Sequence, residues 1–208
     1  MSAPDDVGAA GVAAPDLGDD DRRALLDLAV TAIRARLEGQ RLQIDHARLS
    51  PTLAAPGASF VTLREGDRLL GCIGTIQPTD PLADDVAHNA EQAAFADPRL
   101  PALTPTEFEV MEVKVSVLSP LERLAVRSPA ELAAVVVPGA DGLLLDSRRA
   151  HGTFLPSVWE QLPSVDDFLH HLWRKAGLRP FAWPDDLQVL RYRTLEFGDP
   201  GPRPPIQR

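Results

Sequence analysis

The chain is organised around the stretch Leu69-Leu70-Gly71-Cys72-Ile73-Gly74-Thr75-Ile76, an apolar run that contains two glycines and the chain's one cysteine. Glycine inside a strand costs stability, so Gly71 and Gly74 predict a bulge or the close approach of another segment. The run is apolar at nearly every position, which predicts a central strand that is covered on both faces. Cys72 is therefore the first candidate for a functional residue.

Strands and helices can be placed on both sides of this run. Residues 58–63 and 68–76 predict a hairpin, with Glu65-Gly66-Asp67 as its turn. Apolar residues at helical spacing predict helices over about 19–38, 81–95 and 165–176. Strict alternation over 110–118 predicts a half-exposed strand, and shorter strands are expected over 142–146 and 187–197. The chain therefore mixes helices with hairpin-connected strands.

Composition limits the classes of function. The 208 residues suffice for one domain with a substantial core, and the net charge of -9 argues against a nucleic-acid binder, because phosphate contacts need clustered Lys and Arg. One cysteine allows no disulfide framework within the chain and fits a reducing compartment. No apolar run approaches the length of a bilayer span, and the start lacks the basic region of a signal peptide. We expect a cytoplasmic protein without membrane contact.

The domain limits follow from the same composition. Residues 1–17 consist mostly of Ala, Gly, Pro and Asp, so they predict a disordered N-terminal tail. Residues 18–198 predict one domain, and residues 199–208 a Pro-rich C-terminal tail.

Cys72 has two interpretations. It is either a nucleophile or redox thiol, or a small buried apolar residue, as most free cysteines are. The candidate base for a nucleophile is His151, in the basic turn from Arg148 to Gly152. A Cys-His pair is recognised by proximity, which the sequence does not show, and His151 is otherwise an exposed turn residue.

Other polar residues are candidates for a binding site. Arg149 and its neighbours in the basic turn either bind an anion or are solvated surface charges. Thr75 and Thr153 either present hydroxyls to a ligand or serve as ordinary strand residues. Asn89 lies on the apolar face of its helix, so its amide either bonds backbone groups or lines a site. The histidines lack the spacing of metal ligands, and we expect no metal and no cofactor.

Several short blocks together resemble the AMMECR domain family, whose bacterial and archaeal members include AmmeMemoRadiSam system protein A. The resemblance covers about residues 20–197 and keeps the order and spacing of the blocks Gly71-Cys72-Ile73-Gly74-Thr75, Asn89-Ala90, Asp97-Pro98-Arg99, Val113 to Leu118, Gly152-Thr153-Phe154-Leu155-Pro156, Val158-Trp159 and Lys175-Ala176-Gly177. It implies an α+β fold, with an antiparallel sheet flanked by helices, a smaller second lobe, and a cleft between the lobes. It also implies Memo-like and radical-SAM proteins as partners.

Two positions depart from the family pattern. Leu70 stands where the family usually has Arg, and Ser157 where it often has Gln. If that Arg binds an anion or activates the thiol, this chain lacks its contribution.

Two functions follow from the residues and the resemblance. The first is a cytosolic enzyme or enzyme component that acts on a small molecule or a protein group. Cys72 is then the nucleophile and His151 its base, and Gly71, Gly74, Thr75, Asn89, Arg149 and Thr153 shape the cleft. The alternative is a non-catalytic binding module that docks a Memo-like or radical-SAM partner.

Overall fold

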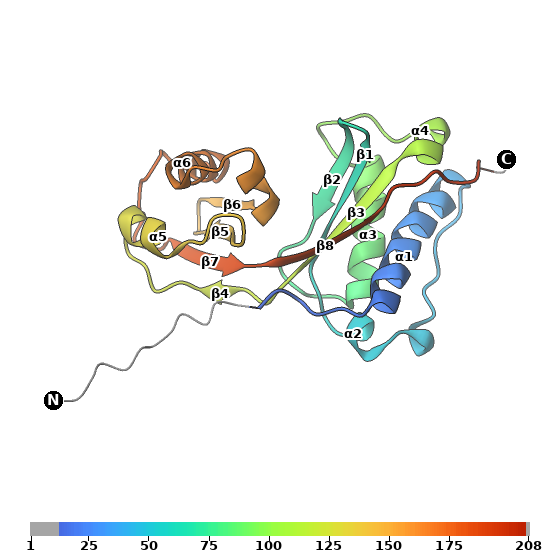
Figure 1. Ribbon diagram of the computed structural model, residues 1–208, viewed down its shortest axis with the longest axis horizontal. Coiled ribbons are helices and arrows are strands. Elements are labelled where there is room, and N and C mark those ends of the chain that lie inside the picture. The colour runs from blue at the N-terminus through green and yellow to red at the C-terminus, as the bar shows by residue number, and fades with distance from the viewer. Residues whose placement is uncertain (1–12, 207–208) are drawn as a thin grey trace. The chain divides into compact units, whose positions relative to one another are not determined.

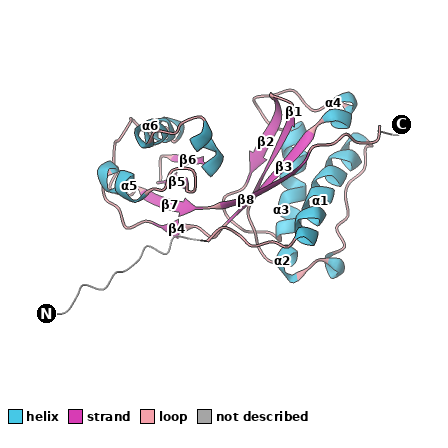
Figure 2. Cartoon of the chain, viewed as in Figure 1, coloured by secondary structure: helices cyan, strands magenta, loops and turns pink. Residues whose placement is uncertain are grey.

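The computed structural model describes residues 13–206, which form an α+β fold of helices and two four-stranded sheets (Figure 2). The helices are α1 (Asp19–Leu37), α2 (Pro51–Ala54), α3 (Leu82–Phe95), α4 (Pro105–Val110), α5 (Pro129–Val135) and α6 (Val165–Lys175), with short 3-10 helices η1 (His46–Arg48) and η2 (Pro156–Glu160). The strands are β1 (Ser59–Glu65), β2 (Arg68–Gly74), β3 (Glu112–Leu118), β4 (Glu122–Arg123), β5 (Gly142–Asp146), β6 (His151–Phe154), β7 (Gln188–Tyr192) and β8 (Thr194–Asp199).

The chain divides into two compact units. The main unit comprises Pro15–Leu118 together with the chain from Leu195 onward. The inserted unit is built on Ser119–Thr194, which lies between those two segments in the sequence. Each unit has its own sheet and its own hydrophobic core.

The sheet of the main unit has the strand order β2-β1-β3-β8. β1 pairs antiparallel with both β2 and β3, as the predicted hairpin and the alternating third strand require. β2 therefore lies at the edge of the sheet, and the prediction of a central strand from its apolar sequence is wrong. The reason is local: helix α3 covers one face of β2, and side chains rather than a further strand bond its outer edge, as described below.

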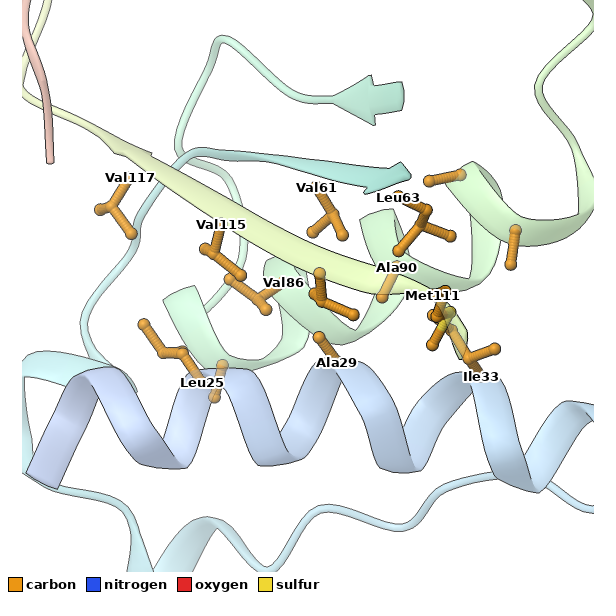
Figure 3. Close-up of a cluster of buried hydrophobic side chains, with 14 of the residues drawn as sticks. Leu25, Ala29, Ile33, Val61, Leu63, Val86, Ala90, Met111, Val115 and Val117 are labelled. Atoms are coloured by element: carbon orange, nitrogen blue, oxygen red, sulfur yellow. The ribbon is translucent and has the colours of Figure 1, made fainter. Parts of the chain in front are cut away.

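Helices α1 and α3 pack on the sheet of the main unit (Figures 1 and 3). Leu25, Ala29 and Ile33 repeat every four residues along α1, which puts all three on one face. Val86 and Ala90 lie on α3 in the same cluster. The strands contribute alternate residues to this core, namely Val61, Leu63, Val113, Val115 and Val117. The face of the sheet turned away from α1 and α3 is called the distal face below.

The Cys72 strand contains both a β-bulge and the close approach of another segment, the two features that its glycines predict. The register of β1 and β2 shifts between Leu63 and Arg64, so that Leu70 is the extra residue of a β-bulge. A Cβ on the next residue, Gly71, would lie 1.9 Å from the carbonyl oxygen of Ala93 in α3. Glycine is thus needed at position 71 because the helix backbone packs directly against the strand.

The sheet of the inserted unit has the strand order β4-β7-β5-β6, and helix α6 of the same unit packs against β6. Its core includes Phe168 and Trp173 of α6, and the Phe168 ring stacks on Trp159 with 3.7 Å between ring centroids. A Cβ on Gly152 would lie 2.7 Å from the Cα of Ala176, so this glycine lets β6 approach the end of the helix.

Two observations concern the regions expected to be tails. The N-terminal prediction falls largely on residues 1–12, which lie outside the described residues, and Leu17 just beyond them is buried in the main core. After β8, Arg203 is 8% exposed and its guanidinium donates to the carbonyl of Met111 and to Asp199. No helix among residues 13–206 is both long and apolar enough to cross a bilayer.

Candidate functional site

Cys72 lies on the distal face of the main sheet, opposite Thr62 of β1. Val61 and Leu63, on either side of Thr62 in β1, are fully buried in the core with the helices, so Thr62 and its partner Cys72 point the other way. The Thr62 hydroxyl donates a hydrogen bond to the Cys72 sulfur at 3.3 Å. The thiol is half-buried, which makes it neither a core residue nor a fully exposed one.

The outer backbone groups of Cys72 are bonded by side chains from the segment that follows α3. The N–H of Cys72 donates to the carboxylate of Asp97 at 3.0 Å, and Arg99 donates from Nη2 to the Cys72 carbonyl at 3.0 Å. Arg99 also donates two hydrogen bonds to the Asp97 carboxylate, from Nε at 2.8 Å and from Nη2 at 2.6 Å. An ion pair therefore replaces the missing neighbouring strand at the position of the cysteine.

Charge stabilises this arrangement. Arg99 lowers the pKa of Asp97 well below its usual value, an effect that the N–H of Cys72 reinforces and that burial opposes. In return, Asp97 raises the pKa of Arg99, burial opposes that increase, and the neighbouring Cys72 adds a smaller increase. The Arg99 guanidinium thus lies within electrostatic reach of the thiol and stays charged.

Gly74 shapes the distal face beside the thiol. A Cβ at this position would lie 2.2 Å from the ring of Phe60, its partner on β1, so glycine leaves room for that ring. On the other side of Thr62, Lys114 of β3 pairs with Glu196 of β8 at 2.8 Å. Cys72 therefore lies in a cross-strand row of polar residues on this face.

Thr75 and Asn89 belong to a different, buried network. The carboxylate of Asp85 accepts bonds from the Ser59 hydroxyl at 2.6 Å, from Asn89 Nδ2 at 3.0 Å and from the Thr75 hydroxyl. Asn89 also donates to the backbone carbonyl of Ser59 at 3.1 Å. Burial raises the pKa of Asp85, and the bonds from Ser59 and Thr75 oppose that increase. Asn89 thus bonds backbone and buried side chains, which fixes α3 against the ends of β1 and β2.

His151 is the first residue of β6, in the inserted unit. It lies opposite Asp146 in the β5–β6 hairpin, and its Nδ1 is 3.2 Å from the Asp146 carboxylate. The imidazole is 62% exposed. An exposed imidazole held by a carboxylate is the arrangement that a general base uses.

Several donors of the basic turn before His151 already make hydrogen bonds within the protein. Arg148 donates from its backbone N–H at 3.1 Å and from Nε at 3.2 Å to Asp186. The backbone N–H groups of Arg149 and Ala150 donate to the Ser147 hydroxyl. These backbone donors are therefore not available to an anion, whereas the Arg149 side chain makes no ion pair with the part of the chain that the structure describes.

Thr153 has a structural environment within the inserted sheet. Its hydroxyl donates to the Leu143 carbonyl at 2.8 Å and is 2.6 Å from the Tyr192 hydroxyl. Tyr192 in turn donates to the Phe154 carbonyl at 3.1 Å. Burial raises the pKa of Tyr192, so the phenol stays protonated and acts as a donor.

The structure divides the predicted site residues between the two units. Gly71, Cys72, Gly74, Thr75 and Asn89 lie in the main unit, and Arg149, His151 and Thr153 lie in the inserted unit.

Sequence reasoning missed three residues that matter to this geometry. Asp97 and Arg99, just beyond the end of α3, are not among the predicted site residues, yet they bond the backbone of Cys72. Asp85 was not singled out, although it precedes Asn89 by one helical turn, and two polar residues four apart on an apolar helix face indicate a shared buried network.

Together, these features define a two-unit α+β protein with a cysteine fixed at the edge of its main sheet. The family model of AMMECR1 matches residues 26–197, and the chain belongs to the AMMECR1 family.

Similar proteins occur in archaea. A protein of Methanothermobacter thermautotrophicus is 35% identical over 191 residues, covering 89% of this chain and 97% of its own length. A protein of Thermofilum pendens is 34% identical, covering 90% of this chain and 93% of its own. The crystal structure of an uncharacterised protein from Pyrococcus horikoshii superimposes with a TM-score of 0.83 at 31% identity, covering 92% of this chain and 98% of that one. The fold is therefore shared along nearly the whole chain.

The structure gives a physical context for the departure at position 70. Leu70 is the bulged residue of β2, and its side chain is 5% exposed within the main core. This chain therefore has an apolar core contact there, while Arg99 supplies a cation close to Cys72 from another segment.

Proposed function

We propose that this protein is a cytosolic enzyme or enzyme component in which Cys72 is the nucleophile, acting on a small molecule or a protein group. The observation that supports this proposal is the fixed position of the thiol. Thr62 bonds the sulfur at 3.3 Å, while Asp97 and Arg99 bond the backbone N–H and carbonyl of the same residue. A nucleophile that is held in place before its substrate arrives loses little entropy on reaction.

The residues have distinct roles in this proposal. Cys72 attacks an electrophilic carbon of the substrate as the thiolate, so that a C–S bond forms while the bond from that carbon to its leaving group breaks and the leaving group departs with the electron pair. His151, oriented by Asp146, is the proposed base. Gly71 and Gly74 let α3 and the Phe60 ring approach the strand, and Thr75 and Asn89 anchor its end through Asp85. Arg149 and Thr153 are the proposed binding residues of the inserted unit.

The test is alkylation of the native protein by iodoacetamide, followed by mass spectrometry across a pH series. The single cysteine makes the signal unambiguous. We expect Cys72 to react in the folded protein, and His151→Ala to slow the reaction at neutral pH. His46→Ala is a matched control, because His46 also pairs with a carboxylate, that of Asp84 at 2.8 Å. A thiol that reacts only after unfolding would overturn the proposal.

A binding module that docks a Memo-like or radical-SAM protein is the second candidate function. It is favoured by the fact that the contacts of Cys72 with Thr62, Asp97 and Arg99 also make sense as purely structural bonds. In this case purified Memo-like and radical-SAM proteins bind wild type and Cys72→Ala equally well, and the thiol of the native protein does not react with iodoacetamide. Binding that is lost in Cys72→Ala, together with a reactive thiol, would instead favour the enzyme.

A further inference from the structure

Arg99 is held beside Cys72 with part of its guanidinium unused. Nε and Nη2 are bonded to Asp97, and Nη2 also reaches the Cys72 carbonyl. The remaining nitrogen, Nη1, donates to no residue in the range 13–206, and the Arg99 side chain is 60% exposed. The group therefore presents free N–H donors at the edge of the strand that carries the thiol.

The ion pair fixes the direction of these donors. The Asp97 side chain is 2% exposed and accepts two bonds from Arg99, so the planar guanidinium has little freedom to rotate. The Nη1 amino group, held in this fixed orientation, presents its two N–H donors to an oxyanion. Asp97 offsets much of the positive charge of Arg99. A preference for an oxyanion over a neutral group therefore arises from these directed, short-range hydrogen bonds.

We propose that the substrate of Cys72 is anionic, and that a carboxylate or similar oxyanion of the substrate binds the free edge of Arg99 beside the thiol. This inference rests on the proposed function, since it names the substrate class of the same site. Arg99 is then a substrate-binding residue, and Asp97 is a positioning residue that acts through it.

The charge state of Arg99 agrees with this role. Asp97 raises the pKa of Arg99 against the opposing effect of burial, so the guanidinium remains protonated. An oxyanion and a thiolate can then share one cation without a proton moving between them.

Two alkylating agents of nearly the same size test the inference, because iodoacetate is an anion and iodoacetamide is neutral. With each agent the thiolate attacks the CH2 carbon, a C–S bond forms, the C–I bond breaks and iodide leaves. The ratio of the two rates cancels any change in thiol exposure or ionisation. We expect Arg99→Gln to lower the iodoacetate-to-iodoacetamide ratio about tenfold, and Arg99→Lys, which keeps the charge but loses the oriented planar donors, to lower it less.

Arg64→Gln is the matched control, because Arg64 is an arginine of the neighbouring strand whose guanidinium is bonded to the carbonyls of Gly66 and Asp67. Its ratio should equal that of the wild type. If Cys72 reacts with both agents but Arg99→Gln leaves the ratio unchanged, the inference is wrong and the proposed function stands. If Cys72 reacts with neither agent in the native protein, both are wrong.

Discussion

The backbone N–H of Cys72 donates to the carboxylate of Asp97 across 25 residues of sequence. The Asp97 carboxylate takes the place of an acceptor on a neighbouring strand. Arg99 takes the place of the donor, because it bonds the Cys72 carbonyl. The edge of the main sheet is thereby closed at the cysteine, and the position of the candidate nucleophile depends on a buried carboxylate outside the sheet.

Replacing Asp97 by Asn should destabilise the protein in a pH-dependent way. The pKa of Asp97 is lowered in the folded state, so its contribution is present above the unfolded pKa of about 3.9 and is lost as the pH falls toward the folded value. We expect wild type to exceed Asp97→Asn by about 1–3 kcal/mol at pH 7, with a smaller difference at pH 3. Urea denaturation of both proteins across this range measures the difference, and a difference independent of pH would contradict the role given to Asp97.

Replacing Asp85 by Asn should show the opposite slope. Burial raises the pKa of Asp85 in the folded state, so its contribution is fully present below the unfolded pKa and is lost as the pH rises through the folded pKa. The stability of wild type relative to Asp85→Asn should therefore decrease from pH 3 to pH 7. The same urea series decides this point, because the Asp97 effect is common to both proteins and cancels. A relative stability that increases with pH would show that the bonds from Ser59 and Thr75 outweigh burial.

Replacing Gly71 by Ala should disturb the contact between β2 and α3. The added Cβ would lie 1.9 Å from the Ala93 carbonyl, and a helix backbone cannot move aside as a flexible side chain can. We expect a loss of about 3 kcal/mol in the free energy of unfolding. Gly18→Ala is the control, since a Cβ there has no neighbour within 4 Å among the described residues, and its loss should stay under about 1 kcal/mol. Equal losses at both positions would refute the packing argument.

The sequence was informative where periodicity and turn chemistry act over short distances. The hairpin around Gly66, the end of α3 at Phe95 and the alternating strand β3 are all confirmed. These features depend on residues a few positions apart, so the local pattern contains the information.

The edge position of β2 could not be predicted in this way. An apolar strand is expected to have neighbours on both sides, but here Leu70 turns into the core at a bulge and Gly71 meets α3. The outer backbone groups are bonded by Asp97 and Arg99, and a carboxylate that bonds a distant backbone leaves no periodic signal.

The candidate site was predictable only in part. Cys72 was evident as a single thiol between glycines, whereas the contacts of Thr62 and Arg99 with it required the strand register and the path of the chain after α3. The Asp85 network was visible only as the spacing of Asp85 and Asn89, because Ser59, which completes it, lies 26 residues from Asp85.

The connection between the two units has a consequence for how this protein could be shortened or diversified. Ser119 and Arg193 exchange two hydrogen bonds, at 2.8 Å and 2.9 Å, and β3 and β8 are neighbours in the main sheet. The chain therefore leaves for the inserted unit and returns from it at one point, as in a domain insertion. A turn of about two to five residues joining Leu118 to Leu195 would keep the strand order of the main sheet. Cys72, Asp97 and Arg99 all lie outside the inserted segment, so the insert could be exchanged while the cysteine and its two partners stay in place.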